Sequence, residues 1–385
     1  MRFVVLLGVV SLLADVTYEG ARSITGPFLG LLGASATVVG IVAGAGELAG
    51  YALRLLSGFL ADRTRRYWMF TIFGYAVNLL AVPALALAGH WPAAAALMIA
   101  ERTGKAIRTP ARDAMLSHAT SELGHGWGFG LHEAMDQIGA VLGPLLVAGV
   151  MFFQQDAYRS AFGVLLIPAL LTLAILFIAR REYPQPSDLE SISTHLTSEG
   201  LPVQFWWFLV GAMLLAVGFA DFPLIAYHLR RAEVTGESTI PLLYAMAMGV
   251  DALAALAFGR LFDRLGPVVL AGAALSAALF SPFVFLGGFR MVVVGMLLWG
   301  VGMGAQESVL RAALAAMIPP ERRGTAYGLF NGGFGLFWFL GSATLGFLYD
   351  RDVMSVVIVS VAAQVLAAAV LFLTLRDSRE RRQNG

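Results

Sequence analysis

Residues 58–67 read GFLADRTRRY, and residues 259–267 read GRLFDRLGP. Both stretches follow a long apolar segment, and both place an Asp-Arg pair a few residues after a glycine. A second pair is related in the same way: RDAMLSHATSELGHGWGFGL at 112–131 and RAALAAMIPPERRGTAYGL at 311–329. Landmarks that recur at a nearly constant offset of about 200 residues indicate two halves in the same orientation, which is a parallel internal repeat.

The composition is that of a polytopic membrane protein. Of the 385 residues, 58% are hydrophobic and 13% are charged, and the mean hydropathy is +0.76, whereas soluble proteins carry about 25% charged residues. A net charge of +1 without a basic tract argues against nucleic-acid binding. The absence of cysteine excludes disulfides, thiolate metal sites and cysteine nucleophiles. The apolar run that starts at the N-terminus continues to about Leu32, so we expect a retained first helix rather than a signal peptide.

Segments of about 20 apolar residues, the length that crosses a bilayer, predict an all-α protein with twelve transmembrane helices. Their ranges are 3–31, 36–60, 68–89, 92–117, 126–153, 158–179, 203–228, 239–262, 267–287, 291–317, 324–348 and 353–375. One long polar stretch, RREYPQPSDLESISTHLTSEGLP at 180–202, has the composition of a linker. We therefore expect a six-helix bundle over 1–180, a cytoplasmic linker over 181–202, and a second six-helix bundle with a short basic tail over 203–385. The repeat relates the two bundles by a pseudo-twofold axis.

Arginine sets the expected orientation. With the N-terminus in the cytoplasm, most arginines near span ends fall inside, and the outer loops receive Arg159, Arg230, Arg231, Arg290 and Arg351. Cytoplasmic loops carry an excess of positive residues. We therefore expect both termini in the cytoplasm of a protein of the plasma (inner) membrane.

Several residues match patterns of a known family. They are Gly58, Asp62, Arg63 and Arg66 of a G-x-x-x-D-R-x-G-R-R signature, a weaker copy at Gly259, Asp263, Arg264 and Gly266, the segment GAVLGPLLVAG at 139–149, and Arg102 followed by Gly104. With them the chain resembles the major facilitator superfamily over essentially its whole length, and through 139–149 its proton-coupled exporter (antiporter) branch. The resemblance implies alternating-access transport through a central cavity. Two departures stand out: Arg65 replaces the signature glycine, and span four carries more charge than drug exporters do, which argues against a lipophilic drug as substrate.

The resemblance also implies a cytoplasmic latch between the halves. In the family pattern Asp62 faces the N-terminus of span eleven, where free N–H groups and the helix dipole favour an anion. Arg63 or Arg66 is then expected to meet Asp113. The whole latch set is Gly58, Asp62, Arg63, Arg66, Asp113, Asp263 and Arg264. The alternative is a charge cluster that only keeps the loop in the cytoplasm.

Span five contains a candidate hinge or seal, formed by Gly139, Gly143, Pro144 and Gly149. Proline removes one backbone hydrogen bond from a helix and allows it to bend. The alternative is simple packing, because small residues at helical spacing let membrane helices approach closely.

Span four carries a stripe of charge. Glu101, Lys105, Arg108 and Arg112 recur at i, i+4, i+7 and i+11, so they share one helix face, and Lys105 is the only lysine in the chain. A charge at the bilayer centre costs about 2.5–3.5 kcal/mol on insertion scales, so this face does not meet lipid. We expect it to line an aqueous cavity; the alternative is a buried structural ion-pair network.

Other polar residues of the spans complete the expected cavity. The candidate substrate ligands are Tyr18, Arg22, Arg54, Glu101, Arg102, Lys105, Arg108, Gln137, Asp221, Asp251, Gln306, Glu307 and Asn331. The candidate proton carriers are Asp15, Glu19, Glu47, Glu133 and Asp136. Among these Glu19 comes first, because Arg22 lies one turn away and is able to exchange partners when the cavity changes access.

These observations favour a transporter over other classes. No H-E-x-x-H, G-x-S-x-G or G-x-x-x-x-G-K-[ST] pattern occurs, which argues against a metalloprotease, a serine hydrolase and a nucleotide-driven pump; a receptor or assembly factor stays open as an alternative. We expect a monomer without cofactor or resident metal that moves a small polar or charged organic solute, with proton-coupled efflux as the leading mode. The alternatives are a uniporter or proton symporter of an anionic metabolite, with Arg102, Lys105 and Arg108 as ligands, and a metal or chelate exporter.

Overall fold

A computed structural model describes residues 2–120, 125–154, 157–184, 200–265, 268–318 and 322–383. The described residues form helices and connecting turns, which confirms the all-α class. Taken singly or as consecutive pieces, these helices form eleven segments that are long and apolar enough to cross a membrane. Helix α4 (Trp91–Thr120) is the twelfth helix of that length, and it stands apart because of its charged residues. Most of the predicted linker, residues 185–199, lies outside the described residues.

The helices follow the predicted spans closely, with several spans built from two consecutive pieces. In chain order they are α1 (Arg2–Leu31), α2 (Ala36–Thr64), α3 (Tyr67–Ala84), η1 (Leu85–Leu87), α4 (Trp91–Thr120), α5 (His125–Phe153), α6 (Tyr158–Val164), α7 (Leu166–Glu182), α8 (Val203–Gly218), α9 (Phe222–Arg231), α10 (Thr239–Leu265), α11 (Val269–Ala278), α12 (Phe280–Leu286), α13 (Phe289–Ala305), η2 (Gln306–Leu310), α14 (Arg311–Met317), α15 (Arg323–Tyr349) and α16 (Val353–Gln383). The piece η2 is a π-helical turn within span ten.

The chain divides into two compact units. The first comprises Met1–Ala34, Ala45–Ile192 and Leu229–Ala245, and the second comprises Ser35–Gly44, Ser193–His228 and Met246–Gly385. Each unit therefore contains one short segment from the other half of the sequence. The first turns of α2 belong to the second unit, and the connection between α9 and α10 belongs to the first.

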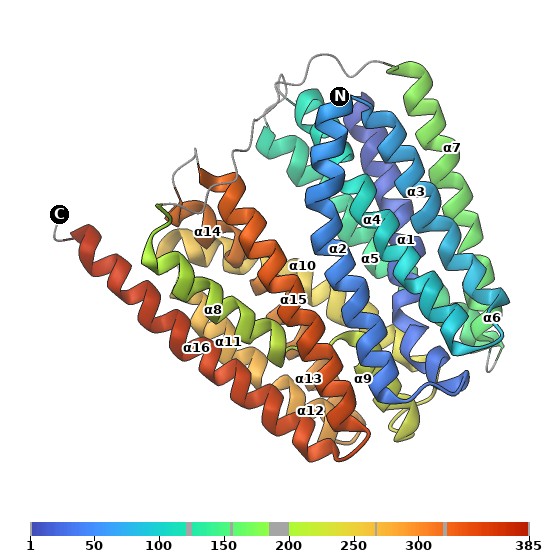
Figure 1. Ribbon diagram of the computed structural model, residues 1–385. Helices are drawn as coiled ribbons and strands as arrows, with labels where there is room; N and C mark the ends of the chain where they lie inside the picture. The colour runs from blue at the N-terminus through green and yellow to red at the C-terminus, as the bar shows by residue number, and fades with distance from the viewer. Residues whose placement is uncertain are drawn as a thin grey trace. The chain divides into compact units, whose positions relative to one another are not determined.

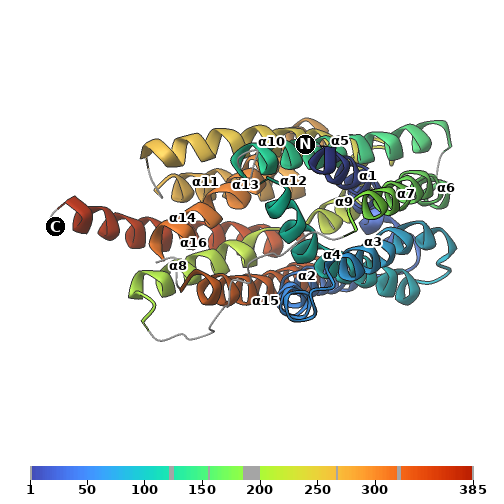
Figure 2. The same ribbon diagram turned by 90° about the horizontal axis from the view of Figure 1, so that it is seen from above.

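Helix α1 is the central helix of the first unit. It packs against α5 along much of its length and also against α7, α6 and α3 (Figures 1 and 2). Because other helices surround it, α1 is mostly buried, including its polar residues Ser11, Asp15, Thr17 and Glu19. Helix α3 packs closely on α4, so α4 presents its charged face to protein rather than to lipid.

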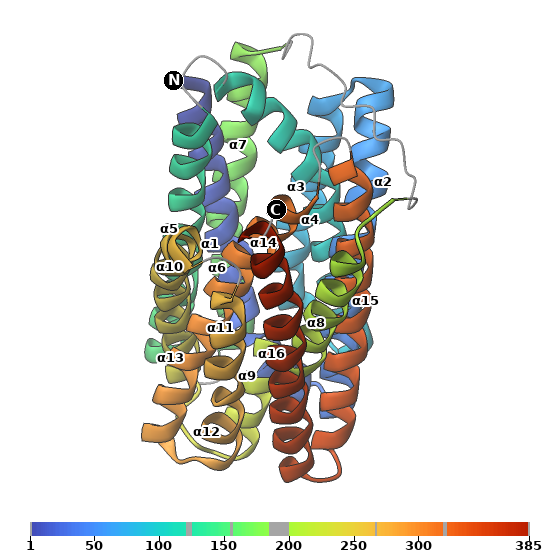
Figure 3. The same cartoon turned by 90° about the vertical axis from the view of Figure 1, so that its left-hand side faces the viewer.

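Helices α8, α11, α15 and α16 form much of the second unit. Helix α16 lies beside α8 and α11, and α8 also packs against α15 (Figure 3). The first turns of α2 join this unit through Asp350, which lies between α15 and α16. The Asp350 carboxylate accepts hydrogen bonds from the amides of Ala36 (3.0 Å) and Thr37 (2.8 Å) and from the Thr37 hydroxyl (2.6 Å). Asp350 therefore satisfies donors that are otherwise unpaired at a helix N-terminus.

The turn between α2 and α3 contains the residue that departs from the family signature. Arg65, which stands where the signature has glycine, adopts a φ of +53°. This left-handed region favours glycine, because a Cβ atom is crowded there. The turn thus keeps the glycine-like backbone although the residue is arginine.

Candidate functional site

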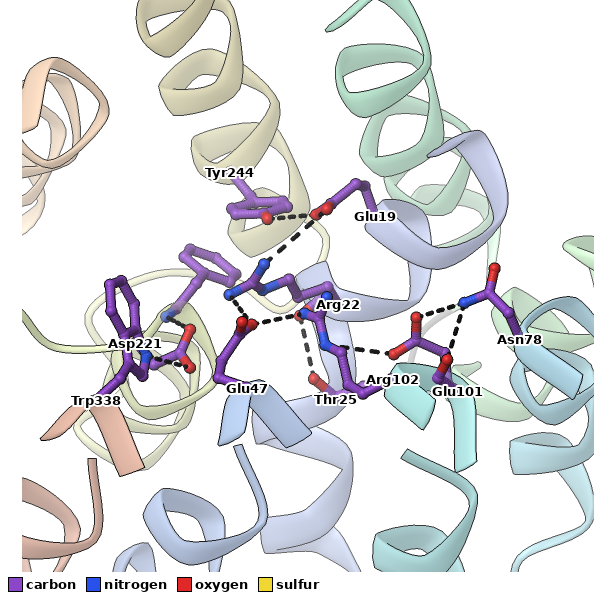
Figure 4. A network of polar contacts seen from close by, with 11 residues as sticks. Glu19, Arg22, Thr25, Glu47, Asn78, Glu101, Arg102, Asp221, Tyr244 and Trp338 are labelled. Carbon is purple, nitrogen blue, oxygen red and sulfur yellow. Dashed lines mark hydrogen bonds and ion pairs between the residues drawn. The ribbon is translucent and has the colours of Figure 1, made fainter. Parts of the chain in front are cut away.

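A network of charged side chains lies within the first unit, where α1, α2 and α4 contribute to it (Figure 4). The Glu47 carboxylate meets two arginines through the same oxygen, Arg22 Nη2 at 3.2 Å and Arg102 Nη2 at 3.3 Å. Arg102 also contacts Glu101 at 3.4 Å, and Arg22 approaches Glu19 at 4.0 Å. Three carboxylates and two guanidinium groups thus form one chain of ion pairs at low exposure.

Two neutral donors end this network. The Tyr244 hydroxyl donates to Glu19 Oε2 at 2.5 Å, and Asn78 Nδ2 donates to Glu101 Oε1 at 2.7 Å (Figure 4). Asn78 lies on α3, and Tyr244 comes from the segment of α10 that belongs to the first unit. These bonds satisfy carboxylate oxygens that the arginines leave open, as buried charges require.

A second cluster surrounds Arg112 at the other end of the charged stripe. Its guanidinium donates to Asp113 Oδ1 at 2.8 and 2.9 Å and to Ser11 Oγ at 2.9 Å, and it lies 3.9 Å from Asp136. His132 joins the cluster through Ser11 at 3.2 Å and Asp136 at 3.7 Å. The Asp113 carboxylate is therefore engaged by its neighbour Arg112, and its pairing with a loop arginine stays a prediction.

Between the two clusters, two cations lie over aromatic rings. The Lys105 ammonium lies 3.9 Å from the centre of the Tyr18 ring. The Arg108 guanidinium lies 4.1 Å from the centre of the Tyr75 ring and 5.8 Å from that of Tyr18. Within the described part of the chain, neither side chain takes part in a hydrogen bond or an ion pair. Their charges are thus held by ring faces.

The remaining candidates of the first unit differ in burial. Asp15 is 6% exposed, and its Oδ1 atom has no hydrogen-bond partner among the described residues. Glu133 is exposed and contacts Gln137 at 3.5 Å, which is the limit of a hydrogen bond. The Arg54 guanidinium stacks on Tyr51 at 5.7 Å.

The candidates of the second unit are Asp221, Asp251, Gln306, Glu307 and Asn331, and they differ in burial. Asp221 is buried and accepts from the Phe222 amide at 3.0 Å and from Trp338 Nε1 at 3.3 Å (Figure 4). Asp251 is also buried. In and near the π-helical turn, Gln306 donates to the Gly302 carbonyl at 3.1 Å and Glu307 is exposed. Asn331 is partly buried.

The predicted latch residues are mostly exposed. Arg63, Arg66, Asp263 and Arg264 are exposed. Asp62, which is exposed as well, accepts a hydrogen bond from the Tyr67 hydroxyl at 3.0 Å. Gly58 lies against Pro110 of α4. The latch across the halves stays a prediction.

The glycines of α5 have a packing role. A side chain at Gly139 would collide with the Leu12 carbonyl oxygen, and one at Gly143 would collide with that of Val16. Both glycines therefore let α5 approach α1 closely. Pro144 follows within the same continuous helix, and nothing lies within 4 Å of a side chain at Gly149. The hinge role of this segment stays a prediction.

Sequence reasoning did not single out several partners of the site. Tyr75, Asn78, Ser11 and Tyr244 all contact charged candidates. Asn78 was recognisable as an amide in the apolar third span, since such residues make hydrogen bonds between membrane helices. Nothing local to Tyr244 indicates that it meets Glu19, because 225 residues separate them.

The helices of this chain are those of a polytopic membrane protein, and comparisons with known proteins identify its family. The model of the Major Facilitator Superfamily matches residues 11–305 and, in a second match, residues 222–385. The chain belongs to this superfamily and is a membrane transporter rather than an enzyme.

Similar proteins agree with this assignment. "Uncharacterized protein Rv2265" of Mycobacterium tuberculosis is 45% identical over 377 residues, which cover 96% of this chain and 92% of that protein. "Uncharacterized MFS-type transporter MJ1317" of Methanocaldococcus jannaschii is 26% identical over 96% of this chain and 94% of its own length. The crystal structure of a variant of the nucleoside transporter NupG is similar with a TM-score of 0.82, covering 97% of this chain and 99% of that one, at 13% identity.

Proposed function

We propose that this protein is a secondary active transporter that moves a small charged organic solute by alternating access and couples this movement to protons. The observation that carries the proposal is Glu47, one carboxylate shared by Arg22 and Arg102. Because Glu47 meets both arginines, one arginine is able to change its partner while the other still pairs with the Glu47 carboxylate. A buried charge left without a partner would be costly in a medium of low dielectric constant. A solute or a proton that binds to one member of the network therefore changes the ion pairs of the other members.

For the direction of transport we propose efflux in exchange for protons. Support comes from the glycine–proline segment of α5, which resembles that of proton-coupled exporters, and from its close packing on α1 at Gly139 and Gly143. Helix α1 carries Glu19 and Arg22, so a bend in α5 acts directly on the helix that holds charged candidates. We further propose a monomer in the plasma (inner) membrane with both termini in the cytoplasm.

A second candidate function is the uniport or proton symport of an anionic metabolite. The cation–aromatic pairs of Lys105 and Arg108 favour it, because both cations keep hydrogen-bond donors available for an anion. A metal or chelate exporter has less support, since no group of three or more His, Cys, Asp or Glu side chains gathers among the residues that the structure describes.

The direction in which protons move distinguishes antiport, symport and uniport. The purified protein is reconstituted into liposomes that contain a pH-sensitive dye, and organic acids, amines, zwitterions and neutral sugars are offered from outside. Entry of a symported solute acidifies the lumen, antiport makes it alkaline, and uniport of a neutral solute leaves the dye unchanged.

Two variants test the role of the network. Glu47→Gln removes the shared charge and is expected to abolish solute-dependent proton flux. Glu182→Gln is the control, since Glu182 pairs with Arg2 at the surface, and it is expected to behave as wild type. Equal flux in Glu47→Gln and wild type contradicts the proposal.

A further inference from the structure

The five cations that α1 and α4 contribute to the candidate site fall into two kinds. Arg22, Arg102 and Arg112 each meet at least one carboxylate within 4.0 Å. Lys105 and Arg108, one helical turn apart on α4, make neither ion pair nor hydrogen bond within the described residues. A buried cation without an anion is costly, so the two exceptions require a reason.

We propose that Lys105 and Arg108 bind the carboxylate or phosphate group of the transported solute, and that Asp15 is the internal carboxylate which this group displaces. The inference rests on the proposed function and specifies its second candidate, the proton-coupled transport of an anion. Arg102 is left out of this anion site, because Glu47 and Glu101 already engage it.

The aromatic rings hold the two cations without using their N–H donors. Tyr18 lies under the Lys105 ammonium, and Tyr75 lies under the Arg108 guanidinium. Nε and Nη1 of Arg108 are buried and have no hydrogen-bond partner within the described part of the chain. Arg108 is 1% exposed, whereas Lys105 is partly exposed. An arriving anion therefore meets the ammonium first and the guanidinium behind it.

The spacing of the two cations suits a single anionic group. Residues at i and i+3 of a helix have Cβ atoms about 5–6 Å apart, so an ammonium and a guanidinium are able to converge on the oxygens of one carboxylate or phosphate. Charge-assisted hydrogen bonds of this kind are about twice as strong as neutral ones. A cationic solute gains nothing from this arrangement.

We assign Asp15 as the internal group that neutralises the pair when no solute is bound, because it lies within electrostatic range of both cations and has an oxygen without a hydrogen bond among the described residues. It is buried on α1 and lies within electrostatic range of Lys105 and Arg108 on α4 and of Asp136 on α5. Tyr18 on the same helix also lies beside Asp15. The other carboxylate within electrostatic range of Lys105 is Glu19, one turn from Asp15, and Glu19 is already held by Tyr244 and Arg22. By contrast, one Asp15 oxygen has no hydrogen bond among the described residues.

Competition for the two cations couples the solute to a proton. When the solute anion takes Lys105 and Arg108, the Asp15 carboxylate loses its counter-charges in a medium of low dielectric constant and takes up a proton. The proton comes from the side of the membrane on which the solute binds and leaves on the side of release. Solute and proton therefore cross together, and Asp15 rather than Glu19 carries the proton.

Binding measurements on the purified full-length protein test the anion site. The probes are inorganic phosphate, succinate and glycerol 3-phosphate, with succinamide and glycerol as their neutral counterparts, and affinity is read by calorimetry and by thermal stabilisation. We expect an anion to bind while its neutral counterpart does not. Lys105→Gln is expected to weaken binding by about tenfold, equivalent to the loss of one charge-assisted contact, and Lys105→Arg to retain most of the affinity. Arg290→Gln, on an exposed arginine, is the control.

The pH dependence tests Asp15. Wild-type affinity for the anion should fall as the pH rises, because the ionised Asp15 competes for the cations. Asp15→Asn should bind more tightly at high pH and lose this dependence. Anion binding that is absent in wild type, or unchanged in both Lys105→Gln and Asp15→Asn, overturns the proposal.

Transport assays separate this inference from the proposed function. If solute-dependent proton flux is present in liposomes and survives Lys105→Gln, the protein is a proton-coupled transporter and the anion site is wrong. If the anion binds through Lys105 but no probe moves protons, the site stands and the proposed coupling is wrong.

Discussion

At the scale of single residues, the site depends on hydroxyl, amide and aromatic groups as much as on charge. Tyr244 and Asn78 donate hydrogen bonds to the carboxylates at the two ends of the ion-pair network, and Tyr18 and Tyr75 lie against Lys105 and Arg108. These neutral groups determine which charges are engaged and which stay available. The role of Glu19 as proton carrier remains a prediction, and its two partners argue for a positioning role instead.

Tyr244→Phe tests this positioning role. The change keeps the ring and removes the hydroxyl that donates to Glu19 at 2.5 Å. A hydrogen bond to a charged group contributes about 1.5–3 kcal/mol, so we expect solute-dependent proton flux to fall by at least about tenfold. The proton flux of reconstituted liposomes is the measurement. Unchanged flux means that the Glu19 carboxylate does not need this donor during transport.

At the scale of elements, α4 shows what the sequence was able to predict. The sequence predicted a helix over 92–117, and the structure has a helix at Trp91–Thr120. The periodicity of its charged residues places them on one face, and its role as a membrane span stays a prediction. The partners were not predictable in the same way. Glu47 meets Arg22 and Arg102 only because three helices bring them together, and Tyr244 reaches Glu19 from the other half of the sequence. Such pairings depend on helix packing, which periodicity does not encode.

Asn78→Leu tests how α3 stabilises the charged helix. Asn78 donates to both the side chain and the backbone carbonyl of Glu101, at 2.7 and 3.1 Å. Leucine has a similar volume but leaves two buried acceptors without this donor, and we expect a loss of stability of about 1–3 kcal/mol. Thermal unfolding in detergent measures it. Asn78→Gln, which keeps the amide, is the control and should lose less.

The capping of α2 by Asp350 predicts a pH-dependent stability. Burial alone would raise the pKa of Asp350, but hydrogen bonds from the Thr37 hydroxyl and from the amides of Thr37 and Ala36 lower it below its usual value. Because the folded-state pKa is depressed, the stabilisation is present above the unfolded pKa of about 4 and is lost as the pH falls through the folded value.

Asp350→Asn measures this contribution. Asparagine keeps one acceptor oxygen but loses the charge and brings an NH2 group toward the donors of Ala36 and Thr37. The variant should therefore melt at a lower temperature than wild type at pH 7, with a loss of stability smaller than the about 0.5–2 kcal/mol of a whole cap, and the difference should shrink as the medium becomes acidic. Glu233→Gln, on an exposed residue, is the control and should match wild type throughout. If the difference in melting temperature between Asp350→Asn and wild type grows in acid, Asp350 does not stabilise α2 through its charged carboxylate.

At the scale of the whole molecule, the sequence predicted the parallel repeat. It predicted only in part how the two units differ in their charged side chains. The first unit carries the ion-pair network, and the second carries buried polar groups such as Asp221 and Gln306, which form hydrogen bonds with Trp338 and with the Gly302 carbonyl. The sequence also placed the boundary between the halves in the linker, whereas the packing assigns Ser35–Gly44 and Leu229–Ala245 each to the unit of the opposite half. This exchange depends on contacts between segments far apart in the sequence.

The expected topology is testable because the chain contains no cysteine. Gly89→Cys lies in a predicted outer loop and Thr64→Cys at a predicted cytoplasmic helix end, and both positions are exposed. A membrane-impermeant maleimide added to intact cells should label the first variant and not the second, and permeabilised cells should show both. Labelling of Thr64→Cys in intact cells reverses the orientation proposed from the arginines.

Lys105 has one more consequence, which follows from its being the only lysine among 385 residues. The protein offers acylating and reductive-methylation reagents a single side-chain amine, and this amine lies over Tyr18 in the candidate site. The mass added to the peptide that contains Lys105 therefore reports how accessible the candidate site is to the reagent. The natural chain needs no engineered label for this purpose, and the rate of modification follows the access of water to the Lys105 ammonium.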